Sequence, residues 1–135
     1  MQSQRIIVNG ILLKDSKVFV AKRSLKKKIA PGKYHLPGGH VEFGEEPVDA
    51  LKREFREEFD LEIKIKDIFR TFAYVLDDVH TIGLSFVLSS DDDLDDIKVD
   101  TDDNEQIAWV DMNNLGDYFE KNDHDFITLS QFFST

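Results

Sequence analysis

The sequence predicts an α+β protein in which a mixed β-sheet lies between α-helices. A stretch that begins at Pro47 has the apolar spacing of an amphipathic helix, whereas the segments before and after it alternate or run apolar as strands do. Short polar turns separate strand pairs at residues 14–16 and at Asp77 and Asp78. Strands on both sides of one helix, with further helical segments at the end, favour a sheet that is flanked by helices.

Each element has its own signal. Strands are predicted over residues 5–13 and 17–23, and a long loop follows them. A helix is predicted to begin near Glu46, because Pro47 suits a first helical turn, where a missing N–H costs nothing. The remaining predictions are strands over residues 62–66, 68–76, 80–89 and 107–110, a short helix over 113–119, and a C-terminal helix over 126–133 that covers the core.

The composition limits the organisation and the partners. With 135 residues, 41% of them hydrophobic, the chain suits a single domain, residues 1–135, with one core. The net charge of −10 argues against nucleic acid polymers, because binding their phosphate backbone requires basic patches. We expect no membrane association, since no apolar run is long enough to span a bilayer and the N-terminus lacks signal-peptide architecture. Zero cysteines exclude disulfides and fit a cytoplasmic location.

The helix that begins near Glu46 has an apolar side and an acidic side. At about 100° per residue, a stripe about 80° wide contains the apolar residues Val48, Leu51, Phe55 and Phe59. The adjoining sector of about 100° carries Glu54, Glu57 and Glu58. Arg53 is the basic residue that reaches these acids most easily, through Glu57 at i+4. The acidic sector therefore keeps an excess of negative charge.

This excess predicts a bound cation. Two carboxylates about 5 Å apart repel by roughly 3 kcal/mol at an effective dielectric near 20, and Glu42 and Glu45 stand just before the helix acids. Mg²⁺, or Mn²⁺ in its place, prefers oxygen ligands and completes its shell with waters and substrate phosphates. Zinc is disfavoured, because cysteine is absent and the four histidines lack metal-ligand spacing. The alternative interpretation is the solvated face of an ordinary helix.

The spacing of these residues resembles the Nudix box of the Nudix (MutT-like) hydrolases. Their pattern, G-x5-E-x7-R-E-U-x-E-E-x-G-U with U a bulky apolar residue, is matched at Gly39, Glu45, Arg53, Glu54, Phe55, Glu57, Glu58 and Leu61. The one departure is Asp60, which replaces a glycine at the end of the helix; Asp visits the left-handed conformation there at a cost of about 1 kcal/mol. The segments VFVAKR and GKYHLPGG before the box, and Glu105 ahead of Trp109, extend the resemblance to most of the chain.

The resemblance implies a Nudix fold and a Mg²⁺-dependent hydrolysis of phosphoric anhydride bonds. It implies that the metal ligands are the side chains of Glu54, Glu57 and Glu58 and the backbone carbonyl of Gly38. The base that takes a proton from the attacking water stays open between an acid of the helix, such as Glu54 or Glu57, and the loop acid Glu105. The metal would polarise the diphosphate and lower the pKa of a bound water.

Supporting roles also follow from the resemblance. Arg53 is expected to orient the acids through its planar guanidinium. Arg23, at the end of a strand, is expected to contact a substrate phosphate, whereas residues 26–28 are expected to be solvated lysines. Glu42 and Glu45 tie the glycine loop to the helix, accept hydrogen bonds from outer-sphere waters of the metal, or are simply acids favoured at a helix start. Glu42 is the weaker candidate.

Several other features of the sequence have no functional assignment. The tract DDDLDDIKVDTDD, residues 91–103, fails as a calcium loop, because Asp96 and Asp102 stand where glycine and glutamate are required. We expect a mobile, solvated loop whose end near Glu105 approaches the metal site. Surface or packing roles are favoured for His35, His40, His80 and Trp109, while Phe72 and Tyr74 stay undecided.

Three classes of function remain. The preferred one is a Mg²⁺-dependent pyrophosphohydrolase of a nucleoside di- or triphosphate, including the 8-oxo-dGTP type that sanitises the nucleotide pool. The runner-up within the enzymes acts on a larger conjugate such as coenzyme A, ADP-ribose or a nucleotide sugar, although Lys28, Leu36 and Leu76 depart from those subgroups. A non-catalytic scaffold and an acidic cation-binding module on residues 91–103 are the other classes. Related enzymes include monomers and dimers, so a homodimer is compatible with the resemblance.

Overall fold

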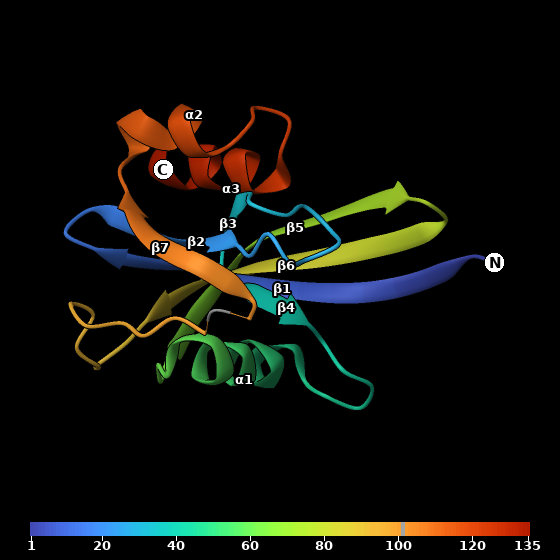
Figure 1. Ribbon diagram of the computed structural model, residues 1–135, viewed down its shortest axis with the longest axis horizontal. Coiled ribbons are helices and arrows are strands. Elements are labelled where there is room, and N and C mark those ends of the chain that lie inside the picture. Colours follow the sequence, from blue (N-terminus) through green and yellow to red (C-terminus); the bar gives the residue numbers. More distant parts are fainter. Residues whose placement is uncertain (101) are drawn as a thin grey trace.

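The computed structural model describes residues 1–135 except residue 101. Its strands are β1 (Ser3–Lys14), β2 (Lys17–Arg23), β3 (Tyr34–His35), β4 (Gly38–His40), β5 (Lys64–Leu76), β6 (Val79–Ser89) and β7 (Asn104–Val110). Its helices are α1 (Pro47–Phe59), the 3₁₀ turn η1 (Met112–Asn114), α2 (Leu115–Tyr118) and α3 (His124–Phe133). Figure 1 shows the strands as a central layer, with α1 on one side and α2 and α3 on the other. This is the predicted α+β architecture.

The strands form a mixed sheet in the order β3-β2-β1-β6-β5, to which β4 adds by pairing with β1 and β7 by pairing with β2. β1 and β6 run parallel, and the other pairs are antiparallel. The two tight hairpins turn at Asp15–Ser16 and at Asp77–Asp78, where all four residues have positive φ. Such turns match the right-handed twist of the strands that they join. Both predicted turns are therefore confirmed.

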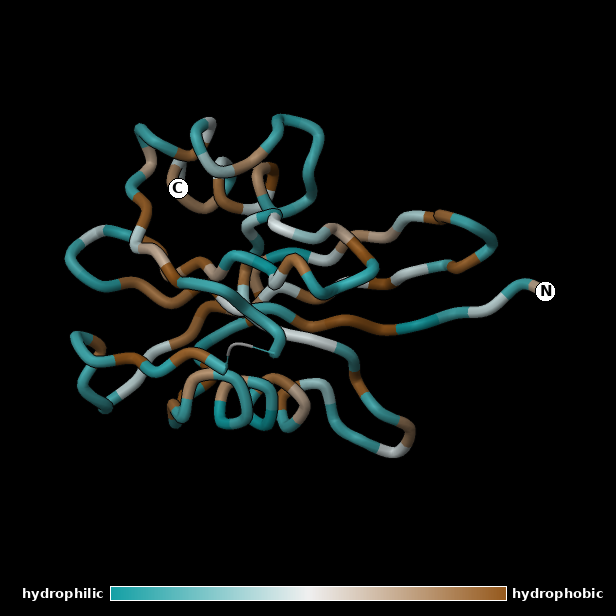
Figure 2. The backbone as a smooth tube through the Cα atoms, viewed as in Figure 1, coloured by the Kyte–Doolittle hydropathy of each residue, from teal (hydrophilic) through white to brown (hydrophobic). Residues whose placement is uncertain are grey.

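Two apolar layers hold the sheet and helices together. One layer packs the sheet against α1 and contains Phe19, Phe55 and Phe59, with the Phe19 and Phe59 rings edge to face at 5.0 Å. The other packs the opposite face against α2 and α3 and is centred on Ile11 and Leu129, both with 0% exposure. In Figure 2 the hydrophobic stretches lie mainly along the inner strands and on the inward sides of the helices. Among the described residues, no helix is both long and apolar enough to cross a membrane.

Several element boundaries differ from the predictions. The predicted long loop contains the short strands β3 and β4, because three or fewer residues give no readable periodicity. The predicted strands over 62–66 and 68–76 form one strand, β5, whose pairing with β6 is interrupted by two register shifts. The short helix divides into η1 and α2, and the C-terminal helix begins at His124 rather than at Phe126.

The acidic tract is attached to the body of the protein more firmly than the expectation of a mobile loop suggested. Its aspartates are mostly exposed, but Leu94 and Ile97 pack against the core under α1. Ion pairs join the tract to three other segments, through Lys14 with Asp95, Lys27 with Asp103, and Lys64 with Asp91. At its end, the Asp100 N–H donates to the Glu58 carbonyl at 3.0 Å, which joins the tract to the last turn of α1.

Candidate metal centre and active site

The glycine pair of β4 brings the backbone close to both β1 and α1. A Cβ atom added to Gly38 would lie 1.9 Å from the Val8 carbonyl oxygen, so only glycine lets β4 lie against β1 here. A Cβ atom on Gly39 would lie 2.5 Å from the Glu54 carboxyl carbon. Both residues therefore have a steric reason to be glycine, and Gly39 shares its space with Glu54 of α1.

Helix α1 begins and ends as predicted. Glu46 is its N-cap and Pro47 opens the first turn. Asp60 ends it in the left-handed conformation, with φ 52° and ψ 39°, and its N–H donates to the Arg56 carbonyl at 3.1 Å. Asp60 thus adopts the left-handed backbone conformation, which glycine adopts at a lower energetic cost. Its side chain stays outside the acid cluster.

Arg53 is the centre of a hydrogen-bonded group of acids. Its Nε and Nη2 atoms donate to the two carboxylate oxygens of Glu45 at 2.9 and 3.1 Å. Its Nη1 atom lies 3.1 Å from Glu54 Oε1 and 3.3 Å from Glu57 Oε2, and Nη2 also donates to the His40 carbonyl at 3.1 Å. The hydrogen bonds from Arg53 lower the pKa of Glu45, and those to Glu45 raise the pKa of Arg53. Arg53 therefore joins α1 to the glycine strand.

Glu54 and Glu58 form a closely interacting carboxyl pair on the inner side of α1. Glu58 is only 8% exposed, and burial, followed by repulsion from Glu54, raises its pKa to about 8. Burial also raises the pKa of Glu54. The Glu58 Oε1 atom accepts a hydrogen bond from Asn104 Nδ2 at 3.0 Å, whereas the buried Oε2 atom has no protein partner among the described residues. A buried, unpartnered oxygen beside a second carboxyl group needs a cation or a proton.

Glu57 is oriented differently from its two neighbours. Its side chain is 59% exposed and is held by Arg53. As a result, no three histidine or acid side chains in the described part of the chain converge as a preformed metal cluster. The carboxylate oxygens still fit a divalent cation. Glu54 and Glu58 supply oxygens at one place, and the exposed side chain of Glu57 projects from the same face of the helix.

Asn104 is the residue near these acids that sequence reasoning missed. It is 1% exposed at the start of β7, where its amide donates to Glu58 and its Oδ1 atom lies 2.9 Å from His35 Nε2. The predicted loop acid, Glu105, is the next residue along β7. Its carboxylate instead accepts from the Leu25 N–H at 3.2 Å and lies 3.6 Å from Lys22 Nζ. No spacing in the sequence distinguishes Asn104 from its acidic neighbour.

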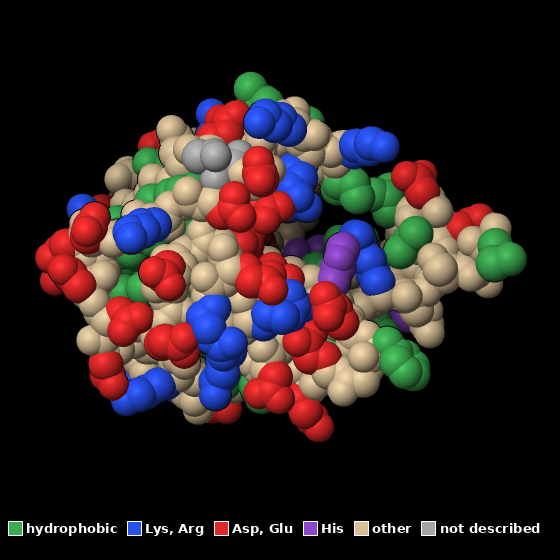
Figure 3. All heavy atoms as spheres, turned by 60° about the horizontal axis from the view of Figure 1, so that its bottom comes forward, with side chains coloured by type: hydrophobic (Ala, Val, Ile, Leu, Met, Phe, Trp, Pro, Cys, Tyr) green, Lys and Arg blue, Asp and Glu red, His purple; other side chains and the backbone are tan. Residues whose placement is uncertain are grey.

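Basic residues lie close to His40 of β4. Arg23 lies at the end of β2, and its Nε atom donates to the Ile29 carbonyl at 2.7 Å. Burial, followed by the charges of Arg5 and then Arg23, lowers the pKa of His40. Figure 3 shows a hollow whose rim carries histidine and basic side chains next to a dense group of acids. Positive and negative groups thus meet at one part of the surface, as binding a metal-bound anion requires.

The remaining candidates lie outside the acid cluster. His80 is on the projecting end of β6 and hydrogen-bonds Gln4 at 2.9 Å. Trp109 packs against Phe19 in the α1-side core at 5.2 Å, as the packing interpretation predicted. Phe72 and Tyr74 have nearly parallel rings, 6° apart, on which the His124 ring stacks at 4.5 and 5.5 Å.

The first turn of α3 supports the loop that leads into the glycine pair. The Asp125 Oδ2 atom accepts from the Leu36 N–H at 2.9 Å, and its Oδ1 atom accepts from Asn9 Nδ2 at 3.3 Å. Burial raises the pKa of this carboxyl group, although the Leu36 N–H acts in the opposite direction. Because Leu36 precedes Gly38 by two residues, α3 helps to fix the approach of β4 to the acids.

Comparisons with known proteins agree with this geometry. The family model of the NUDIX domain matches residues 4–130. An ADP-ribose pyrophosphatase from Methanocaldococcus jannaschii is 35% identical over 112 residues, which are 82% of this chain and 63% of that protein. An 8-oxo-dGTP diphosphatase from Proteus vulgaris is 37% identical over 83 residues, 61% of this chain and 72% of the relative. A nucleoside triphosphatase NudI from Escherichia coli is 35% identical over 58% of this chain and 54% of its own length.

A solved structure shows the same fold. A MutT protein from Methanosarcina mazei superposes with a TM-score of 0.83 over 98% of this chain and 95% of that one, at 21% identity. The chain spans less than two thirds of the length of the relatives from M. jannaschii and E. coli. The match to the family model nevertheless covers nearly all of the chain, together with the acids, the arginine and the glycine pair described above. The chain therefore belongs to the Nudix hydrolase family.

Proposed function

We propose that this protein is a Mg²⁺-dependent pyrophosphohydrolase that cleaves a diphosphate bond in a nucleoside di- or triphosphate or a related nucleotide. The observation that supports this proposal best is the buried pair of Glu54 and Glu58, in which Glu58 Oε2 has no partner among the described residues. Such a pair suits a hard divalent cation, which also binds phosphate oxygens. The printed names of the relatives, which include a diphosphatase and a triphosphatase, point to the same chemistry.

The protein's own groups have separate roles in this proposal. Glu54, Glu57 and Glu58, with the Gly38 carbonyl, would hold the cation, which supplies a bound water of lowered pKa and polarises the diphosphate. Arg53 holds the carboxylates of Glu54 and Glu57 close to each other, because its Nη1 atom contacts both. Either Glu54 or Glu57 accepts the proton of the attacking water.

Glu105 fits the role of base less well than the helix acids do. Its carboxylate is engaged by the Leu25 N–H and by Lys22, so that the neighbouring Asn104, rather than Glu105, contacts Glu58. A base must come within hydrogen-bonding reach of the water that it deprotonates. We therefore place the base on α1. Arg23 remains the proposed phosphate contact at the end of β2, since no carboxylate of the described residues is within ion-pair distance of it.

The test is a panel of nucleoside di- and triphosphates, including 8-oxo-dGTP, assayed with Mg²⁺ for the wild type, Glu57→Gln and Glu58→Gln. We expect Glu58→Gln to lower kcat by at least about 100-fold, because it removes one charge from the metal-binding pair. Glu62→Gln is the matched control, since Glu62 is an exposed acid paired with Arg56 just beyond the same helix. Turnover at the wild-type rate in both site variants would refute the assigned acids.

A second candidate is a larger diphosphate conjugate as the substrate. The relative that aligns with 82% of this chain is named an ADP-ribose pyrophosphatase, which favours including such conjugates. The panel should therefore contain ADP-ribose, coenzyme A and a nucleotide sugar. If one of these conjugates is cleaved faster than every nucleoside triphosphate, and its cleavage depends on Glu58, the conjugate is the better assignment of the substrate class. Binding of nucleotides without any cleavage would instead support the non-catalytic scaffold.

A further inference from the structure

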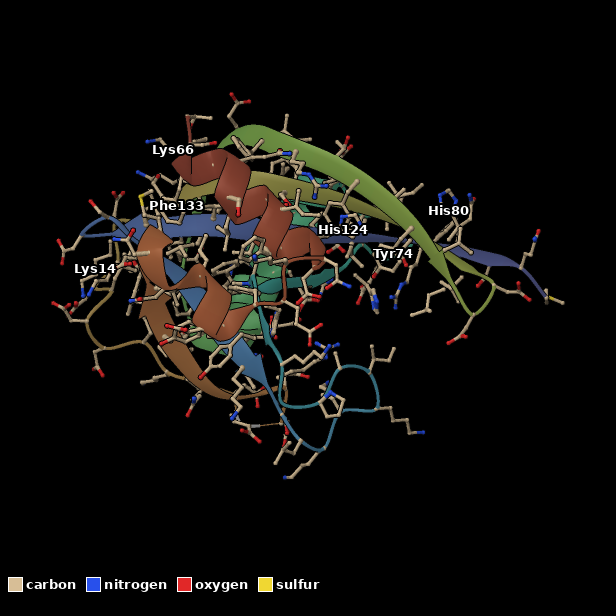
Figure 4. All side chains as sticks on the ribbon, turned by 90° about the horizontal axis from the view of Figure 1, so that it is seen from above. Lys14, Lys66, Tyr74, His80, His124 and Phe133 are labelled. Carbon is tan, nitrogen blue, oxygen red and sulfur yellow. The ribbon has the colours of Figure 1, made fainter. Side chains whose placement is uncertain are left out.

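The sheet face that packs under α3 carries three rows of side chains, which the strand register sets side by side on β1, β6 and β5. From the projecting end inward, the rows are Arg5, Thr81 and Tyr74; Ile7, Gly83 and Phe72; and Asn9, Ser85 and Arg70. Helix α3 covers the innermost row, because Asp125 bonds Asn9 and Thr128 bonds Arg70. The outermost row lies at the start of α3, where Figure 4 shows Tyr74 next to His124 with the strands continuing toward His80.

Arg5 is fixed in this outermost row without a neutralising acid. Its Nε atom donates to Thr81 Oγ1 at 2.7 Å, and Thr81 is 0% exposed. Among the described residues, no carboxylate is within ion-pair distance of Arg5, whereas Arg53 and Arg56 are both paired with glutamates. In a protein with 27 acidic and 17 basic residues, an arginine that is anchored yet paired with no acid of the described residues leaves its Nη2 atom available for an anion from outside the chain.

Arg5 also lies beside the glycine strand. Its Nη1 atom is 3.4 Å from His40 Nε2, and His40 follows Gly39 directly in β4. The His40 carbonyl accepts from Arg53, which holds Glu54. Arg5 therefore lies next to His40 of β4, whose backbone carbonyl contacts the arginine that holds the metal-binding acids.

We propose that Arg5 contacts a phosphoryl oxygen of the substrate and that Thr81 is the positioning residue that holds its guanidinium for this contact. The inference deepens the proposed function, because it names a second source of positive charge for the diphosphate. Arg70 does not share this role. Although no carboxylate of the described residues pairs with it, its terminal nitrogens are directed to His124 and Thr128 of α3.

The test measures the binding of inorganic pyrophosphate in the presence of Mg²⁺ by calorimetry. We expect Arg5→Gln to weaken binding by about tenfold or more, the usual effect of losing a charge-assisted hydrogen bond. Arg5→Lys should lie between Arg5→Gln and the wild type, because it keeps the charge and loses the planar fork. Thr81→Val leaves the net charge unchanged and should still weaken binding several-fold. Thermal unfolding of each variant establishes that it is folded.

Lys66→Gln is the matched control for charge. Lys66 is exposed and lies toward the other end of β5 from Tyr74 (Figure 4), so its loss should change the pyrophosphate affinity less than twofold. The inference is overturned if Arg5→Gln binds as the wild type does, if Lys66→Gln weakens binding equally, or if the wild type does not bind pyrophosphate. Binding requires no bond cleavage, so Arg5-dependent binding without nucleotide turnover would count against the proposed function alone.

Discussion

Gly39 leaves no room for a side chain between β4 and Glu54. Because a Cβ atom there would lie 2.5 Å from the Glu54 carboxyl carbon, Gly39→Ala must move that carboxyl group. A displacement of about 1 Å in a catalytic group can cost roughly 100-fold in rate. We expect kcat/KM of Gly39→Ala to fall by about that factor, measured on the best nucleotide of the panel, with little loss of stability because the far end of a glutamate can shift.

The control for this change is Gly116→Ala in α2. Apart from the adjoining residues and the backbone of the helix itself, no described atom lies within 4 Å of the Cβ position at Gly116, so alanine fits without displacing other groups. We expect unchanged activity and a small gain in stability, up to about 1 kcal/mol, since alanine is favoured over glycine in helices. An equal fall in activity for both variants would show that the Gly39 effect does not come from Glu54.

A substitution at Asp60 should change the stability of the fold and leave the catalytic activity unchanged. Its φ of 52° lies in the left-handed region, which costs a non-glycine residue about 1 kcal/mol. We expect Asp60→Gly to raise the free energy of unfolding by about that amount, measured by urea denaturation, and to leave kcat/KM unchanged. A less stable Asp60→Gly variant would mean that the aspartate side chain contributes an interaction that outweighs the backbone strain.

The first turn of α3 supports the approach to the glycine pair, and this contact predicts that stability depends on pH. Burial raises the pKa of Asp125 in the folded state above its ordinary value of 3.8. The protonated form is therefore favoured by folding. Its stabilising contribution is complete below the unfolded-state pKa and is lost as the pH rises through the folded-state pKa.

Asp125→Asn removes this titration while keeping an oxygen that can accept from the Leu36 N–H. We expect the stability of the variant relative to the wild type to improve as the pH is raised above the ordinary carboxyl pKa of 3.8, measured by denaturant unfolding at each pH. Parallel pH profiles for the two proteins would show that the Asp125 carboxyl group has no shifted pKa.

The elements also show where sequence reasoning succeeds and where it ends. The start of α1 at Glu46, its apolar stripe and both hairpin turns are local properties, and the sequence predicted them. Strands β3 and β4 are too short to show a hydrophobic periodicity. They form because β4 pairs with β1 and β3 pairs with β2. A partner that is far away in the sequence leaves no local signal.

The same limit applies to the candidate site across the whole molecule. The spacing in α1 predicted an acidic sector next to the apolar stripe, and the structure buries one of its members, Glu58, against β7. Asn104 and Arg5 could not be selected in this way, because their contacts with Glu58 and His40 join residues far apart in the chain. Tertiary pairing, rather than composition, decides which polar residues meet.

In the proposed function, the carboxyl pair of Glu54 and Glu58 binds a divalent cation within a Nudix fold. The most direct measurement is the binding of Mn²⁺, which has the ligand preferences of Mg²⁺ and is visible by electron paramagnetic resonance. We expect the wild type and Glu62→Gln to bind Mn²⁺ alike, and Glu58→Gln to bind it at least about tenfold more weakly. Equal Mn²⁺ affinity in the wild type and in Glu58→Gln would contradict the claim.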